Sequence, residues 1–316
     1  MGQVNSWGSG TAREAEEGED ETIEPICEGR VAVVTGGGRG LGREHVLELV
    51  RQGARLVVND TGCRIDGTGH DERPASDVVD EVRALGGEAV ANHDDVADWK
   101  GAQRLVDQAV DAFGGLDVVV NNAGILRDRM VVNMTDVEWD AVVNVNLRGT
   151  FALTHFAAAY WRDQFKAGAR VDGRVVNTVS SAGLFGTAGQ SNYAAAKAAV
   201  AALTVVAAKE LARYGVTVNA VSPRSARTRM TERSGATQDP PDGFDPHDPA
   251  NVSPMVAWLA GTAARHVTGQ VFEVVGGTVT LLEGWRRGPQ AETPRRWSPA
   301  ELGPVVDGLL ATATAT

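Results

Sequence analysis

A tyrosine and a lysine, Tyr193 and Lys197, are separated by three alanines in a stretch that predicts a helix over 193–214. Positions i and i+4 of a helix lie on one face, so the two side chains can act together. A nearby ammonium favours the phenolate and lowers the pKa of a tyrosine, which makes the phenol a proton donor and acceptor near neutral pH. The spacing therefore predicts acid–base chemistry, with a pair on a helix surface as the alternative interpretation.

A glycine-rich turn could bind a phosphate. Residues 35–42 read TGGGRGLG and lie between a predicted strand at 31–35 and a predicted helix at 41–51. Glycines let a phosphate approach the backbone closely, and the N–H groups of a helix N-terminus attract negative charge. The spacing differs from the usual GxGxxG fingerprint of dinucleotide sites, so a tight turn without a ligand is the alternative.

Asp60 supports a dinucleotide site, because it ends the next predicted strand, 55–60, at an offset of 18 residues from Gly42. A carboxylate about 20 residues beyond the turn accepts hydrogen bonds from ribose hydroxyls. Its charge also repels a 2′-phosphate, which favours NAD over NADP. Arg39 in the glycine turn is the opposing feature, since its guanidinium could pair with a 2′-phosphate.

A regular alternation of strands and helices must position these residues. Further strands are predicted at 88–92, 116–120, 173–179, 216–221 and 271–275, the last of them, and further helices at 77–85, 103–113, 137–147 and 149–164. Continuous apolar strands separated by helices indicate a parallel sheet that is covered on both faces. With right-handed crossovers, this order predicts an α/β fold with a doubly wound parallel sheet, a Rossmann-like single domain with a C-terminal extension.

Three segments are expected along the chain. Residues 1–26 carry seven carboxylates against one arginine, which predicts a disordered acidic tail, and residues 27–282 form the Rossmann-like domain. Residues 283–316 are expected to pack on the domain or on a neighbouring subunit, because a capped helix start at 298–301 precedes an apolar face too small to be stable alone. Within the domain, 61–76 and 224–252 are predicted to be functional loops or disordered segments.

The composition excludes several classes of protein. No run of about 18 apolar residues suggests a membrane span, and the first residues lack the pattern of a secretory signal. The net charge of −11 argues against a nucleic-acid partner. The two cysteines, Cys27 and Cys63, have no metal-ligand spacing, so we expect no metal site and free thiols in the reducing cytoplasm.

Four motifs in one order resemble those of the short-chain dehydrogenase/reductase family. They are the glycine turn, the Asn-Asn-Ala-Gly segment 121–124 after a strand, Ser180, and the pair of Tyr193 and Lys197. The resemblance covers about residues 30–282. It implies a nicotinamide cofactor, a small-molecule alcohol or ketone substrate, and a homotetramer or homodimer.

The resemblance also implies roles for individual residues. Tyr193 would be the general acid and base, and Lys197 would bind the nicotinamide ribose. Ser180 would hydrogen-bond the substrate carbonyl, and Asn146 would hold a water that links the lysine to solvent. The cofactor would be bound by a larger set of residues, namely Gly36, Arg39, Gly40, Leu41, Gly42, Asp60, Asp95, Val96, Asn122, Ala123, Gly124, Tyr193, Lys197, Pro223 and Thr228.

One position departs from the family pattern, which commonly places glycine after the proline that follows the sixth strand. Arg224 stands there, in place of a residue that is free to take a positive φ, which puts the cofactor contact at this turn in doubt. The three arginines 224, 227 and 229 could bind an anionic substrate or form a solvated loop.

These features predict an NAD(H)-dependent oxidoreductase that interconverts a secondary alcohol and a ketone. A narrower resemblance, at 57–60, 124–129 and 297–301, is to the (3R)-hydroxyacyl-CoA dehydrogenase unit of multifunctional enzymes and implies a 3-hydroxyacyl thioester substrate. A keto-reductase or alcohol dehydrogenase of secondary-metabolite or steroid metabolism is the enzymatic alternative. The non-enzymatic alternative is a catalytically silent NAD-binding regulator, which should lack one of the four residues given catalytic roles.

Overall fold

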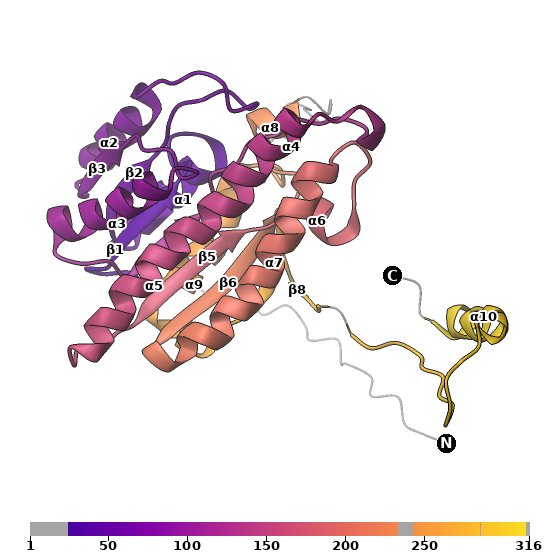
Figure 1. The fold of residues 1–316 in the computed structure, drawn as a ribbon. Helices are drawn as coiled ribbons and strands as arrows, with labels where there is room; N and C mark the ends of the chain where they lie inside the picture. Colours follow the sequence, from indigo (N-terminus) through magenta and orange to yellow (C-terminus); the bar gives the residue numbers. More distant parts are fainter. Residues whose placement is uncertain (1–24, 233–242, 285, 314–316) are drawn as a thin grey trace, which may run out of the picture.

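Eight strands form one sheet in the computed structural model, which describes residues 25–232, 243–284 and 286–313 (Figure 1). The strands are β1 (Val31–Thr35), β2 (Arg55–Asn59), β3 (Ala89–Asn92), β4 (Val118–Asn121), β5 (Gly173–Thr178), β6 (Val216–Pro223), β7 (Val271–Val275) and β8 (Thr278–Leu282). Their order is β3-β2-β1-β4-β5-β6-β7-β8. All neighbours are parallel except β7 and β8. The predicted doubly wound α/β sheet is therefore confirmed.

The long helices cover both faces of the sheet (Figure 1). One face is covered by α1 (Gly40–Arg51), α2 (Arg73–Ala84) and α9 (Ser253–Ala260), and the other by α3 (Trp99–Phe113), α5 (Thr150–Lys166) and α7 (Ser191–Leu211). Three other helices, α4 (Asp136–Val143), α6 (Ser181–Phe185) and α8 (Arg229–Glu232), come after β4, β5 and β6, and α10 (Leu302–Thr312) comes after the sheet.

The apolar runs predicted to be strands are buried because alternate residues enter two different cores. Ala32 and Val34 of β1 pack in the cluster that contains α1 and α9 residues. Val31 and Val33 pack in the opposite cluster with residues of α3 and α5. Since side chains alternate across a strand, a run without polar residues is what a sheet covered on both faces requires.

The sequence analysis missed one strand and placed the starts of two helices too late. The strand 271–275 is not the last described one, because the chain reverses at Gly276, with φ of 52°, and β8 pairs back on β7. Helix α3 begins at Trp99, four residues earlier than predicted, since the Asp98 side chain accepts the N–H groups of Lys100 and Gly101. Helix α2 also begins four residues early, with a proline in its first turn.

The sheet order places a crevice where the site residues are expected. The chain leaves β1 toward β2 on one side and crosses to β4 on the other, so the loops after β1 and β4 diverge above their carboxyl ends. Thr35, the last residue of β1, links β1 to the loop after β4 at the bottom of this crevice. Its Oγ1 accepts hydrogen bonds from the N–H groups of Asn122 and Ala123, both at 3.0 Å.

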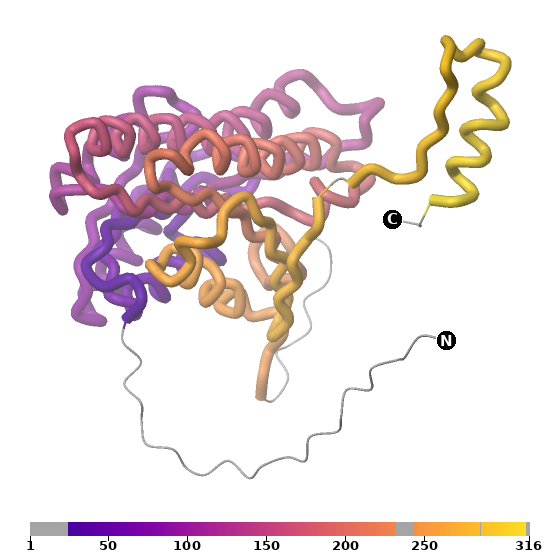
Figure 2. The backbone as a smooth tube through the Cα atoms, turned by 90° about the horizontal axis from the view of Figure 1, so that it is seen from below, coloured from indigo at the N-terminus to yellow at the C-terminus, as the bar shows by residue number. Residues whose placement is uncertain are grey.

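The two ends of the described chain behave differently. Near the N-terminal end, Ile26 is partly buried and packs against the core. At the other end, α10 lies apart from the helices around the sheet in both views (Figures 1 and 2). Residues 1–24, which hold nearly all of the predicted acidic tail, and 233–242 of the predicted loop at 224–252 lie outside the described residues. No helix in the described ranges is long and apolar enough to cross a membrane.

Candidate active site

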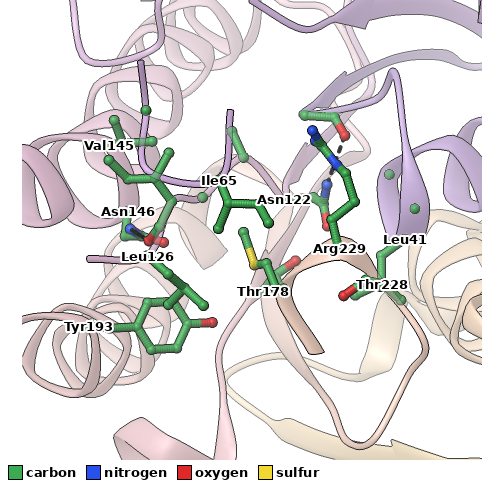
Figure 3. Close-up of a pocket in the computed structure, with 18 of the residues that line it drawn as sticks. Leu41, Ile65, Asn122, Leu126, Val145, Asn146, Thr178, Tyr193, Thr228 and Arg229 are labelled. Carbon is green, nitrogen blue, oxygen red and sulfur yellow. Dashed lines mark hydrogen bonds between the residues drawn. The ribbon is translucent and has the colours of Figure 1, made fainter. Parts of the chain in front are cut away.

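One cavity of about 950 Å³ brings together all the residues predicted to act on substrate or cofactor. Figure 3 shows part of its wall, with Tyr193 and Asn146 on one side and Leu41 and Thr228 on the other. The predicted residues that line it are Gly36, Arg39, Gly40, Leu41, Gly42, Asp60, Asp95, Val96, Asn122, Ala123, Gly124, Asn146, Ser180, Tyr193, Lys197, Pro223 and Thr228. They follow the carboxyl ends of β1 to β6, or lie on the helices beyond them.

The glycine turn after β1 leaves no room for side chains. A Cβ atom at Gly42 would lie 2.0 Å from the carbonyl oxygen of Gly36, and one at Gly36 would lie 2.9 Å from Cα of Ala123. Gly36 and Gly40 have positive φ values of 63° and 51°. Only glycine meets both demands, so the backbone itself forms this wall of the cavity.

The start of α1 is suited to an anion. Arg39 occupies the N-cap position without a side-chain cap, and the first turn contains no acidic residue. Among the described residues, no side chain caps the N–H groups of that turn, which carry the positive end of the helix dipole. The glycine turn exposes its backbone, and the first turn of α1 presents N–H groups beside it. This arrangement fits the pyrophosphate of a dinucleotide.

Asp60 follows β2 beside this turn. Its carboxylate accepts the N–H of Gly38 at 2.9 Å and the N–H of Gly62 at 2.7 Å, which fixes its position. Asp95 and Val96, two of the predicted cofactor-binding residues, line the cavity and follow β3, the strand next to β2. The residues at the ends of β1, β2 and β3 could thus hold the adenosine half of a dinucleotide.

The opposite wall carries the groups suited to proton transfer. Tyr193 and Lys197 lie on α7, with the lysine Nζ 5.7 Å from the centroid of the tyrosine ring. The buried Nζ donates a hydrogen bond to the carbonyl oxygen of Thr178 at 2.7 Å. Ser180 follows β5, caps α6 with its hydroxyl, and hydrogen-bonds to the Tyr193 side chain.

The electrostatics of this pair differ from the sequence-based expectation. Burial raises the pKa of Tyr193 to about 12, partly offset by the hydrogen bond with Ser180, and the Asp128 carboxylate raises it further. Burial also lowers the pKa of Lys197 to about 8. The expected lowering of the tyrosine pKa is therefore not seen, because burial is the largest cause of the shift and acts in the opposite direction. With this pKa the phenol is protonated at neutral pH and can act as a proton donor.

Asn146 lies in a π-helical segment, Asn144–Gly149, between α4 and α5. Its fully buried side chain donates to the carbonyl oxygens of Ile125 and Val142, both at 3.0 Å. Its Oδ1 is buried and accepts no hydrogen bond from the described residues. A buried acceptor without a hydrogen bond costs free energy, and a water in the adjacent cavity could supply that bond. The position of Oδ1 therefore fits the predicted role of Asn146 in holding a water.

The loop between β2 and α2 supplies wall residues that the sequence analysis did not single out. The carbonyl oxygens of Ile65 and Asp66 accept hydrogen bonds from Leu126 N, at 2.9 Å, and Arg127 Nε, at 2.7 Å. The loop therefore reaches from β2 across to the segment after β4. Its glycine- and aspartate-rich composition predicted a functional loop, but no pattern within it identifies the side chains that face the cavity.

Arg224 does not take the positive φ that the family pattern gave reason to expect. That conformation falls on the next residue, Ser225, with φ of 58°. Arg224 lines the cavity with a side chain that is 59% exposed, 3.5 Å from Glu273. Arg227 pairs with Asp245 at 2.8 Å, so the three arginines of this loop do not act as one solvated group.

The fold and the site define an α/β protein that binds a nucleotide cofactor in a crevice beside a tyrosine–lysine pair. Comparison with known families gives a match to the short chain dehydrogenase model over residues 30–239. The chain belongs to the short-chain dehydrogenase family, whose members depend on NAD or NADP.

The chain is similar to several dehydrogenases, and the name of one of them includes an acyl-CoA substrate. The chain is 53% identical to the hydroxyacyl-CoA dehydrogenase ChsB1 of Mycobacterium tuberculosis, over 80% of this chain and 80% of that protein. It is 41% identical to a peroxisomal hydratase-dehydrogenase-epimerase of Neurospora crassa, over 82% of this chain but 27% of that longer protein. A crystal structure of a short chain dehydrogenase from Mycobacterium avium is similar with a TM-score of 0.83 and 52% identity, covering 92% of this chain and 97% of that one. These relatives support an oxidoreductase that acts on a hydroxyl group.

The position of Tyr193 predicts a specific kinetic defect. Tyr193→Phe should lower kcat by about 10²–10⁴-fold, because the proton partner is lost, while the Kd for the cofactor stays within twofold. Tyr160→Phe is the matched control, since Tyr160 packs against the core on α5 and does not line the cavity. A Tyr193→Phe variant that keeps more than about a tenth of the rate would show that another group handles the proton.

The raised pKa of Tyr193 predicts opposite pH dependences for the two directions. Alcohol oxidation needs the phenolate, so its kcat/KM should rise at least about tenfold from pH 6 to pH 8. Ketone reduction needs the protonated phenol and should stay level over that range, then fall above pH 8 as Lys197 loses its proton. Initial rates in both directions at constant ionic strength test this. Oxidation that is independent of pH between 6 and 8 would contradict it.

Proposed function

We propose that this protein is an NAD(H)-dependent oxidoreductase that interconverts the alcohol and ketone of a 3-hydroxyacyl thioester. The observation that carries the proposal is the arrangement of Ser180, Tyr193 and Lys197 on one wall of a cavity whose opposite wall is a bare, uncapped glycine turn. A dinucleotide in this crevice would extend from the turn toward the tyrosine, so that its reactive ring and the substrate meet there.

Each catalytic side chain has a role that follows from its partners. A bound nicotinamide would supply the carbon that accepts or donates the hydride. Tyr193 gives a proton to the oxygen of the ketone, or takes one from the alcohol, and Ser180 donates a hydrogen bond to the same oxygen. Lys197 is held by Thr178 below the phenol, where its positive charge also suits the hydroxyls of a nicotinamide ribose.

NAD is the proposed cofactor because of Asp60. Its carboxylate is fixed by two backbone N–H groups beside the turn, where it would accept bonds from ribose hydroxyls and repel a 2′-phosphate. The thioester substrate is supported by the name of one relative, a hydroxyacyl-CoA dehydrogenase that is 53% identical to this chain. A reductase is the second candidate, because the chain is 40% identical to a 3-oxoacyl-[acyl-carrier-protein] reductase of Synechocystis over 97% of that protein.

A catalytically silent cofactor-binding protein is disfavoured. Such a protein has no need to keep a lysine buried beside a tyrosine, yet Lys197 is only 3% exposed and bonds to a backbone oxygen beneath the cavity.

We further propose that the protein works in the cytoplasm as a homo-oligomer. The exposed apolar side chains of the C-terminal segment support the second part of this proposal.

The C-terminal segment presents apolar surface away from its own domain. Leu302, Val306 and Leu310 lie four residues apart on α10 and are 41%, 46% and 68% exposed. A helix of 11 residues is marginal in isolation, so this face needs a partner surface to be stable. Because α10 lies apart from the domain, we propose that residues 283–316 pack on a neighbouring subunit, near the substrate end of its cavity (Figure 2).

The test of the proposed function compares substrates and cofactors in one assay at the NADH absorbance. A 3-oxoacyl-CoA should give a kcat/KM at least about 100-fold above that of a small cyclic ketone, and NADH should be preferred to NADPH. Asp60→Asn should narrow the cofactor preference, because it removes the charge and keeps an acceptor. Asp80→Asn on the outer surface of α2 is the control. Equal or better use of NADPH would contradict the cofactor proposal, and a preference for the simple ketone would contradict the substrate proposal.

Removal of residues 283–316 tests the proposed role of the C-terminal segment. The truncated protein should contain fewer subunits per particle by light scattering than the full chain, and its KM should rise more for a CoA thioester than for a small ketone. An equal rise of KM for both substrates would mean that the segment has only a structural role and does not contact the thioester substrate. An unchanged number of subunits together with an unchanged KM would contradict the proposal.

A further inference from the structure

The loop that follows Asp60 brings a second carboxylate to the glycine turn. Asp71, the residue at the end of this loop, places its Oδ2 3.9 Å from a terminal nitrogen of the Arg39 guanidinium. The loop is held closed, because the N–H of Asp71 donates to the carbonyl oxygen of Thr61 at 3.0 Å. The position of this carboxylate is therefore part of the fold of the loop.

Asp71 is also fixed by Arg73 at the start of α2. Its carboxylate accepts bonds from Nε and Nη2 of that arginine, at 3.0 and 2.9 Å, and from the backbone N–H at 3.1 Å. These hydrogen bonds lower the pKa of Asp71 to about 2, so the carboxylate is charged at any pH at which the enzyme works.

Arg39 is thus flanked by two carboxylates. Asp60 binds the N–H of Gly38, the residue directly before Arg39, and Asp71 faces the guanidinium itself. A 2′-phosphate carries a charge of nearly −2 at neutral pH, so it meets repulsion from both carboxylates. Arg39 lies in the glycine turn and could offset this repulsion, but its guanidinium already faces the Asp71 carboxylate.

We infer that Asp71 is a second determinant of cofactor choice, a positioning residue that keeps Arg39 from pairing with a 2′-phosphate. Asp71 does not line the cavity, whereas Arg39 does, so the effect passes through the arginine. The inference rests on the proposed use of NAD. It explains how an arginine in the glycine turn, the feature that opposes this choice, is compatible with it.

The test measures Kd for NADPH and NADH by calorimetry with the full chain. Asp71→Asn keeps an oxygen for the N–H of Arg73 and removes the charge. It should tighten NADPH binding by about five- to tenfold and change NADH binding by less than twofold. In the double variant Asp71→Asn/Arg39→Gln the gain should disappear, because it depends on the freed guanidinium. Asp66→Asn is the matched control in the same loop, since its carboxylate bonds only to Thr68 among the described residues.

Several results would overturn the inference. One is an NADPH affinity that does not change in Asp71→Asn. Another is an equal loss of affinity for both cofactors, which would mean that Asp71 only stabilises the loop. The single variant Arg39→Gln gives a test that does not depend on the folding of Asp71→Asn. It should change NADPH affinity less than twofold, and a tenfold loss would mean that Arg39 already binds the phosphate. Wild-type protein that binds NADPH as tightly as NADH would instead contradict the proposed use of NAD itself.

Discussion

The site depends on how closely the turn after β1 approaches the loop after β4. The amide of Asn122 donates to the carbonyl oxygens of Thr35 and Gly36, at 3.0 and 3.2 Å, while Thr35 Oγ1 binds the backbone of the same loop. Any side chain at Gly42 would collide with both partners of this contact. The contact fixes the floor of the crevice and leaves the uncapped end of α1 facing it, so the place for negative charge is set by the backbone.

The opposite wall of the crevice, formed by α7 and the end of β5, contains a buried charge that lowers the stability of the folded protein. Lys197 reaches from α7 to a carbonyl oxygen at the end of β5, and its burial lowers its pKa from 10.5 to about 8. At pH values below 8, the buried ammonium therefore lowers the free energy of unfolding by about 3 kcal/mol. This penalty shrinks as the pH rises from 8 toward 10.5. A charge kept in so unfavourable a place is typical of a group retained for chemistry.

The sequence was sufficient to predict the sheet and the residues around the cavity, because strand ends and glycine spacing are local signals. It did not predict β8, which forms through a glycine turn and pairing with β7. Contacts made by the loop after β2 were also missed, since Ile65 meets Leu126 across about 60 positions of chain. The direction of the Tyr193 pKa was wrong for a similar reason. Spacing reports that a lysine is near, whereas burial, which decides the pKa, is set by the whole fold.

Hydride transfer between a nicotinamide and a carbinol carbon in this cavity is the central claim, and isotope transfer measures it directly. The full chain would be given a 3-oxoacyl-CoA and NADH with deuterium on one face of nicotinamide C4, and the product would be examined by mass spectrometry and NMR. We expect one deuterium on C3 of the 3-hydroxyacyl product from one of the two labelled faces and none from the other. Product that carries no deuterium with either face labelled, while NADH is consumed, would contradict the claim.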